Sequence, residues 1–80
     1  MPTFLLHHRH RPDECVVAFA AWRGFASPLR HHHAPSTCLT GGHAIWWRVQ
    51  APDLAAALSL VPRYVADRTE PIEVRDVEIP

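Results

Sequence analysis

The chain has 80 residues, which suffice for one domain with a thin margin of stability. Its apolar share of 48% is too high for a disordered chain. Eight arginines balance eight carboxylates, so no long-range field favours nucleic acid or an anionic membrane as a partner. Seven histidines are the compositional anomaly.

Targeting and redox signals are few. There is no cationic start followed by an apolar segment, and no apolar run approaches the roughly 18 residues of a membrane span. The two cysteines, Cys15 and Cys38, are too few for a disulfide scaffold. We therefore expect a cytoplasmic protein with reduced thiols.

The first predicted strand, Met1–His10, is apolar at its start and rich in imidazole at its end. Strand alternation places Phe4, Leu6, His8 and His10 on one face. A helix is predicted over Pro12–Ala26, because proline and two carboxylates suit a first turn and Ser27-Pro28 ends the apolar stripe.

The second half is predicted to contain three strands and one interrupted helix. Ser36–Thr40 is a short β-branched strand, Gly41-Gly42 a hairpin turn, and His43–Ala51 the clearest strand of the chain. Pro62 should break or kink a helix that starts at Leu54 and continues over Arg63–Ala66. The alternation of Ile72–Ile79 predicts a last strand.

The predicted order, strand-helix-strand-strand-helix-strand, is the ferredoxin-like βαββαβ plan of the α+β class. It implies a four-stranded antiparallel sheet with two helices on one face, over residues 1–80 as a single domain. Three stretches carry a resemblance to the dimeric α+β barrel superfamily: MPTFLLHHRH, GGHAIWWRVQA and LSLVPRYVADRTEPIEVRDVEIP. The last is also similar to the endings of short uncharacterised bacterial proteins of actinobacterial type.

The resemblance implies a homodimer in which two sheets pack face to face. The superfamily includes muconolactone isomerases, small monooxygenases, haem-degrading enzymes and chlorite dismutases, so it does not select one function. The residues favour the same dimer independently. Leu5 and Phe4 cannot share a face, nor can Trp46 and Trp47, so helices on one side leave apolar surface for a second copy to cover.

The predicted topology brings the end of the first strand beside the hairpin. We therefore expect His8, His10 and His43 to lie together, with Cys38 across the hairpin. Such a set suits a transition metal (Zn, Ni or Cu), and these four residues are the predicted metal ligands. The alternative is that the histidines are polar strand-end residues bonded to backbone or water. Cys15 belongs to the same end, but buried cysteines more often act as small hydrophobes than as ligands.

A small-molecule pocket is the second prediction for this domain. An aromatic wall with nearby guanidinium groups would suit a planar or anionic ligand, and the candidate residues are Arg9, Trp46, Trp47 and Arg48. An enzyme of isomerase or cofactor-independent monooxygenase type would use such a pocket, with a histidine for acid–base work. A protein with a purely structural role remains the third alternative. The tract His31–His33 is predicted to be a solvated loop at the opposite end of the sheet.

Overall fold

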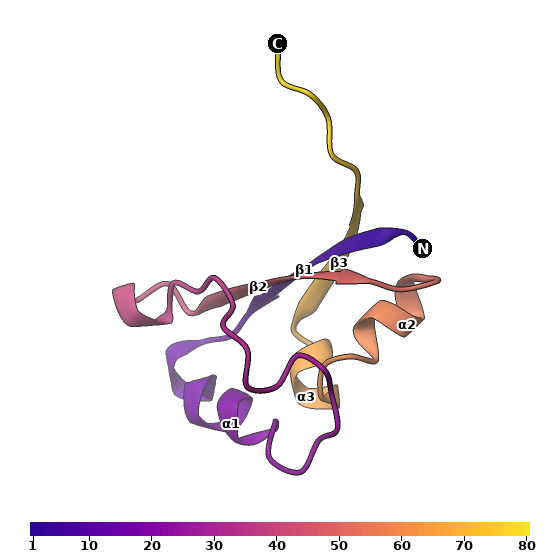
Figure 1. Cartoon of the computed structure of the whole chain (residues 1–80). Coiled ribbons are helices and arrows are strands. Elements are labelled where there is room, and N and C mark those ends of the chain that lie inside the picture. The colour runs from indigo at the N-terminus through magenta and orange to yellow at the C-terminus, as the bar shows by residue number, and fades with distance from the viewer.

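The computed structural model describes residues 1–80 as an α+β fold with one three-stranded sheet (Figure 1). The strands are β1 (Thr3–Arg9), β2 (Ala44–Gln50) and β3 (Thr69–Val74). The α-helices are α1 (Cys15–Ala20), α2 (Leu54–Leu58) and α3 (Arg63–Ala66), and two 3₁₀-helices, η1 (Pro12–Glu14) and η2 (Cys38–Thr40), complete the elements.

The sheet is antiparallel, and β1 lies between β2 and β3. Leu6 of β1 faces Trp47 on one side and Pro71 on the other. Pairing with β2 extends over Thr3–Arg9 and pairing with β3 over Thr3–His8, so β1 is the central strand. The predicted alternation of β1 is confirmed, since Phe4, Leu6 and His8 are buried and the residues between them are not.

All three helices lie on one side of the sheet (Figure 1). The core between the two layers is small and apolar, and it consists of Phe4, Leu6, Val49, Ala51, Ala57, Val61 and Val65. Trp22 and Trp47 pack against this core from its margin. None of the helices is long and apolar enough to cross a lipid bilayer.

The predicted strand over Ser36–Thr40 is wrong, and with it the four-stranded ferredoxin-like sheet. Only Ser36 forms a bridge, to Ile45, and the following residues form η2. The Thr37 carbonyl accepts the N–H groups of Thr40 (3.0 Å) and Gly42 (2.8 Å). These local hydrogen bonds close a turn, so pairing with β2 ends at Thr37, whose N–H donates to the Ala44 carbonyl at 2.9 Å.

The two glycines of this turn have different roles. Gly41 adopts φ 90°, which glycine reaches without steric cost. Gly42 has no positive φ, but a side chain there would collide with Thr37. The predicted turn at Gly41-Gly42 forms, but it is wider than a two-residue hairpin, since the nearest bridged pair is Ser36 and Ile45.

The helices are shorter than predicted. The first ends as α1 at Ala20 instead of Ala26, and turns carry the chain to Gly24, which has φ 74°. The predicted interruption at Pro62 is confirmed, because it separates α2 from α3. The Asp53 side chain caps α2 by accepting the Ala56 N–H at 2.8 Å.

The last strand starts and ends earlier than the predicted Ile72–Ile79. It begins at Thr69, and residues 75–80 extend away from the sheet (Figure 1). The side of the sheet opposite the helices carries Leu5, Trp46 and Ile72, as the alternation predicts. The homodimer that would cover this side stays a prediction.

Candidate metal centre

Side chains that could ligate a metal gather where β1 ends and β2 begins. Arg9 pairs with Ala44, and the His10 N–H donates to the His43 carbonyl at 3.1 Å. The sheet register therefore holds these two histidines together by backbone hydrogen bonds. The predicted proximity of His10 and His43 is confirmed.

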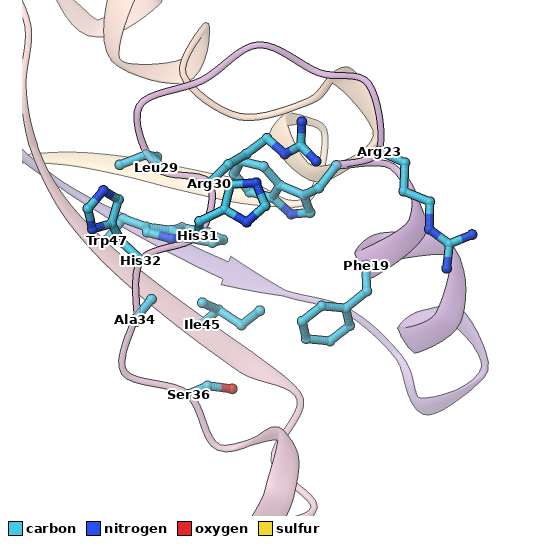
Figure 2. A pocket seen from close by; sticks show the side chains of 11 residues that line it. Phe19, Arg23, Leu29, Arg30, His31, His32, Ala34, Ser36, Ile45 and Trp47 are labelled. Carbon is cyan, nitrogen blue, oxygen red and sulfur yellow. The ribbon is translucent and has the colours of Figure 1, made fainter.

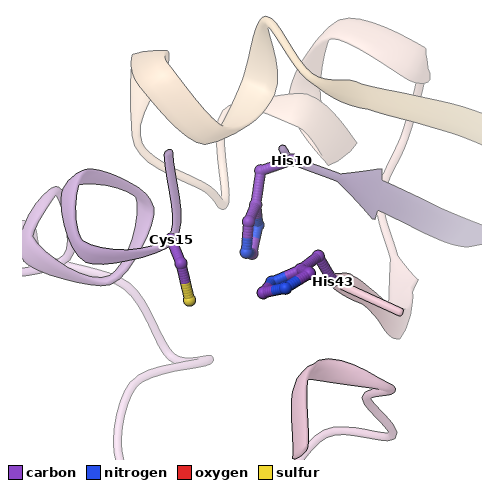
Figure 3. Close-up of side chains that lie close together, drawn as sticks. All are labelled: His10, Cys15 and His43. Carbon is purple, nitrogen blue, oxygen red and sulfur yellow. The ribbon is translucent and has the colours of Figure 1, made fainter. Parts of the chain in front are cut away.

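Three side chains from three segments converge at this end. The ligand atoms of His10, Cys15 and His43 all lie within 4.8 Å of one another, and Figure 3 shows the side chains pointing into a common space. Cys38 lies beside them, with its Sγ 3.9 Å from Nε2 of His10. Two imidazoles and one thiol thus form the cluster, and the second thiol, of Cys38, borders it at His10.

This spacing is close to that of a tetrahedral zinc site. Zinc bonds of about 2.0–2.3 Å imply ligand atoms roughly 3.3–3.8 Å apart. The distance from Cys38 to His10 is already near that range. Among His10, Cys15 and His43, the most distant pair of ligand atoms would need to approach by about 1 Å to reach that range.

His43 carries two signs of a residue held for a purpose other than packing. Its φ of 53° is in the left-handed region that non-glycine residues seldom adopt. Its Nδ1 is buried and has no hydrogen-bond partner. Buried polar atoms are almost always paired, and strained backbone concentrates at functional sites. A metal ion would provide this nitrogen with a partner.

His8 lies behind the cluster, with both ring nitrogens engaged. Its Nδ1 is 3.3 Å from both the Val65 carbonyl oxygen and Thr69 Oγ1, and its Nε2 is 2.9 Å from Nδ1 of His10. The Thr69 hydroxyl donates its hydrogen to Val65 at 2.6 Å. Since both neighbours of His8 Nδ1 can only accept, that nitrogen carries the hydrogen.

This assignment fixes the tautomer of His10. With its hydrogen on Nδ1, a neutral His8 has a free lone pair on Nε2, which accepts the Nδ1–H of His10. The lone pair of His10 is then on Nε2, the nitrogen near Cys38. Metal-ligating histidines are held in this way, with the other ring nitrogen bonded to an acceptor.

Burial keeps both rings in the neutral form that metals bind. Desolvation lowers the pKa of His8 below its ordinary value, and the neighbouring His10 lowers it further. Desolvation also lowers the pKa of His10, with His43 as the second cause. Both rings are neutral at pH 7, so a cation need not displace protons from them.

An ion pair fixes the start of α1, on which Cys15 lies. Glu14 accepts a 2.9 Å hydrogen bond from the Arg68 guanidinium and a 2.8 Å bond from the Arg11 N–H. Arg68 in turn stacks over the Tyr64 ring at 3.7 Å. The hydrogen bond from Arg68 is the largest cause that lowers the pKa of Glu14 to about 2. The pair joins the first helical turn to the segment that precedes β3.

The lowered pKa of Glu14 predicts an acid-dependent contribution to stability. The folded state favours the carboxylate, so its contribution is complete above the ordinary pKa of 4.5 and is lost as the pH falls toward 2. We expect Glu14→Gln to destabilise the protein at pH 7 and to match the wild type near pH 2. Urea unfolding of both proteins across this range measures the difference. Glu78→Gln, in the exposed tail, should show none of it.

Of the four residues predicted to bind a small molecule, Trp46, Trp47 and Arg48 line one cavity between β2 and the loop before it, and Arg9 lies outside that cavity. Arg9, Trp46 and Arg48 lie on the side of the sheet without helices, where Trp46 stacks on His7 at 5.1 Å and Arg48 pairs with Asp76. Trp47 lies on the helix side, 5.6 Å from Trp22. The predicted division of Trp46 and Trp47 between the two faces is confirmed, and their ligand-binding role stays a prediction.

The histidine tract His31–His33 is not at the opposite end of the sheet. Because no strand fills positions 36–40, the preceding loop lies along the outer edge of β2, where the Trp46 N–H donates to Pro35 at 2.9 Å. All three histidines are exposed, as predicted. His31 and His32 line a cavity with Trp47 (Figure 2).

Cys15 is the member of the cluster that sequence reasoning left out of the ligand set. Its position at the start of the helix after β1 indicated the correct end of the molecule. The sequence favours a small buried hydrophobe at this position, although Ala18 is the only buried residue of α1. No known protein family, curated protein or solved structure matches this chain significantly.

Proposed function

We propose that this protein binds one transition-metal ion, with Zn²⁺ favoured, through His10, Cys15, Cys38 and His43. The observation that carries the proposal is the convergence of three ligand atoms within 4.8 Å from separate segments, one of them on a residue with an orphaned buried nitrogen. Two sulfur and two nitrogen ligands suit tetrahedral Zn²⁺ better than octahedral cations.

The composition of the site also favours a structural role for the metal. Four protein ligands leave no open coordination position, which is the arrangement of structural zinc sites. Two thiolates neutralise the charge of a divalent ion, so the loaded site adds no net charge to a partly buried region. The metal would join β1, α1, η2 and the start of β2 at one point.

The test is a Co²⁺ titration of the tag-free protein, followed by Zn²⁺ displacement. We expect one equivalent of Co²⁺, an intense visible spectrum typical of tetrahedral geometry, and a sulfur-to-cobalt charge-transfer band. The combined variant His31→Ala, His32→Ala, His33→Ala should keep all three signals, because this tract lies outside the cluster. Loss of binding in that variant would refute the assigned site.

Single cysteine variants count the thiolates. Cys15→Ser and Cys38→Ser should each reduce the charge-transfer intensity to about half, because one of the two thiolate ligands remains. An unchanged band in Cys38→Ser would mean a three-residue site with an open position. The stoichiometry of bound metal in each variant, from elemental analysis, distinguishes a lost ligand from a lost site.

A further inference from the structure

A second site lies beside the candidate metal centre, in a cavity of about 380 Å³ between α1, the loop over residues 29–36 and β2 (Figure 2). Aromatic rings form much of its wall: Phe19 and Trp22 from the helix side, and Trp47 from the sheet. The Trp22 and Trp47 rings lie 5.6 Å apart with planes tilted by 49°. A planar ring would find apolar aromatic surface here.

The ionisable groups of this cavity are all basic, and Ser36 adds one hydroxyl. Its lining includes Arg23, Arg30, His31 and His32, and no aspartate or glutamate. This is unusual in a chain whose arginines and carboxylates are equal in number. Elsewhere Arg11, Arg48, Arg63 and Arg68 have carboxylate partners, and Arg9 and Arg75 have none. The two arginines at the cavity form no ion pair.

Each of these arginines has hydrogen-bonding capacity to spare. The guanidinium of Arg30 donates one long hydrogen bond of 3.4 Å to the Phe25 carbonyl, and the guanidinium of Arg23 donates none. A guanidinium is always charged and has five N–H donors in a planar fork that matches a carboxylate. Arg30 is partly buried, so a carboxylate beside it would be less screened than one at an open surface.

We propose that this cavity binds a small aromatic carboxylate, with its ring against Trp47 and Trp22 and its carboxylate on Arg30 or Arg23. The volume is at the lower end of the range for ligand pockets, about 300–1,000 Å³, which fits one or two fused rings. The site takes no residue from the proposed metal ligands. It therefore goes beyond the proposed function and does not depend on it.

The test uses 2-naphthoate as the probe and the full chain as the protein. We expect saturable binding that changes the tryptophan fluorescence and is at least about tenfold tighter than that of the neutral analogue 2-naphthalenemethanol, since a charge-assisted hydrogen bond is lost. Arg30→Gln combined with Arg23→Gln should remove this preference. Arg75→Gln, in the exposed tail outside the cavity, should keep it.

Three results would overturn the proposal. They are equal affinities for the acid and the alcohol, no saturable binding of either, and an equal loss in the Arg75→Gln control. Arg23 is exposed and Arg30 is half-buried, and urea unfolding of each variant checks that it is folded. Adding Zn²⁺ should leave naphthoate binding in place, and a failure of metal binding would leave this result unaffected.

Discussion

Replacing His10 with alanine should reduce the affinity for Co²⁺ and Zn²⁺ by more than about a hundredfold. Loss of a hydrogen-bond partner behind a ligand costs up to about that factor, and loss of the ligand itself should cost more. His10 is central to the cluster, because Cys15, Cys38 and His43 all lie around its ring. Competition with a chelator of known affinity measures the loss. His32→Ala is the matched control, since it removes an exposed imidazole outside the cluster.

His8 should affect metal binding only through His10. We expect His8→Phe to weaken binding by roughly 10–100-fold, because it removes the acceptor that holds the His10 hydrogen on Nδ1. His8→Gln should lose less, since its side-chain oxygen can accept the same hydrogen. In a His10→Ala background, His8→Phe should cost nothing further. Additive losses in the double variant would show that His8 is itself a ligand.

Leu6→Ala should have the largest effect on folding. Leu6 is fully buried on the central strand, and such a truncation costs about 2–5 kcal/mol of unfolding free energy. A domain of this size has only about 4–12 kcal/mol in total. Leu39→Ala is the matched control, because this leucine is fully exposed on η2. Urea unfolding should give a much lower midpoint for Leu6→Ala and an unchanged one for Leu39→Ala.

The parts of the fold that could be predicted rest on strong local patterns. The alternation of β1 and β2, and the division of Trp46 and Trp47 between faces, follow from the period of a strand. The antiparallel register then places His10 beside His43. The break at Pro62 follows from the geometry of proline.

The parts that could not be predicted depend on competition between local and long-range hydrogen bonds. Ser36–Thr40 has the composition of a strand, but the Thr37 carbonyl closes a turn with Thr40 and Gly42 instead. Strand propensity only describes how a residue fits a sheet that already exists. The ends of α1 and β3 were likewise displaced by several residues, where no proline or glycine lies next to the true boundary.

The site was predicted in place but not in detail. The sequence placed His8 among the ligands and Cys15 outside them, whereas in the structure Cys15 lies in the cluster and His8 lies behind it. Both positions depend on contacts between residues far apart in the chain. The Nδ1 of His8 contacts Val65 and Thr69, and the residue spacing within β1 cannot predict these contacts. The position of Cys15 depends on the Glu14–Arg68 pair, whose members are far apart in the chain.

The segment between α1 and η2 contains no helix or strand over residues 21–37, which is a long stretch for a small domain. Cys15 precedes this segment, and Cys38 and His43 follow it. A metal bound to all of them would act as a covalent-like cross-link, closing a loop whose ordering otherwise costs conformational entropy. Metal loading would thus restrict the same loop that carries Arg30 and forms one wall of the aromatic cavity.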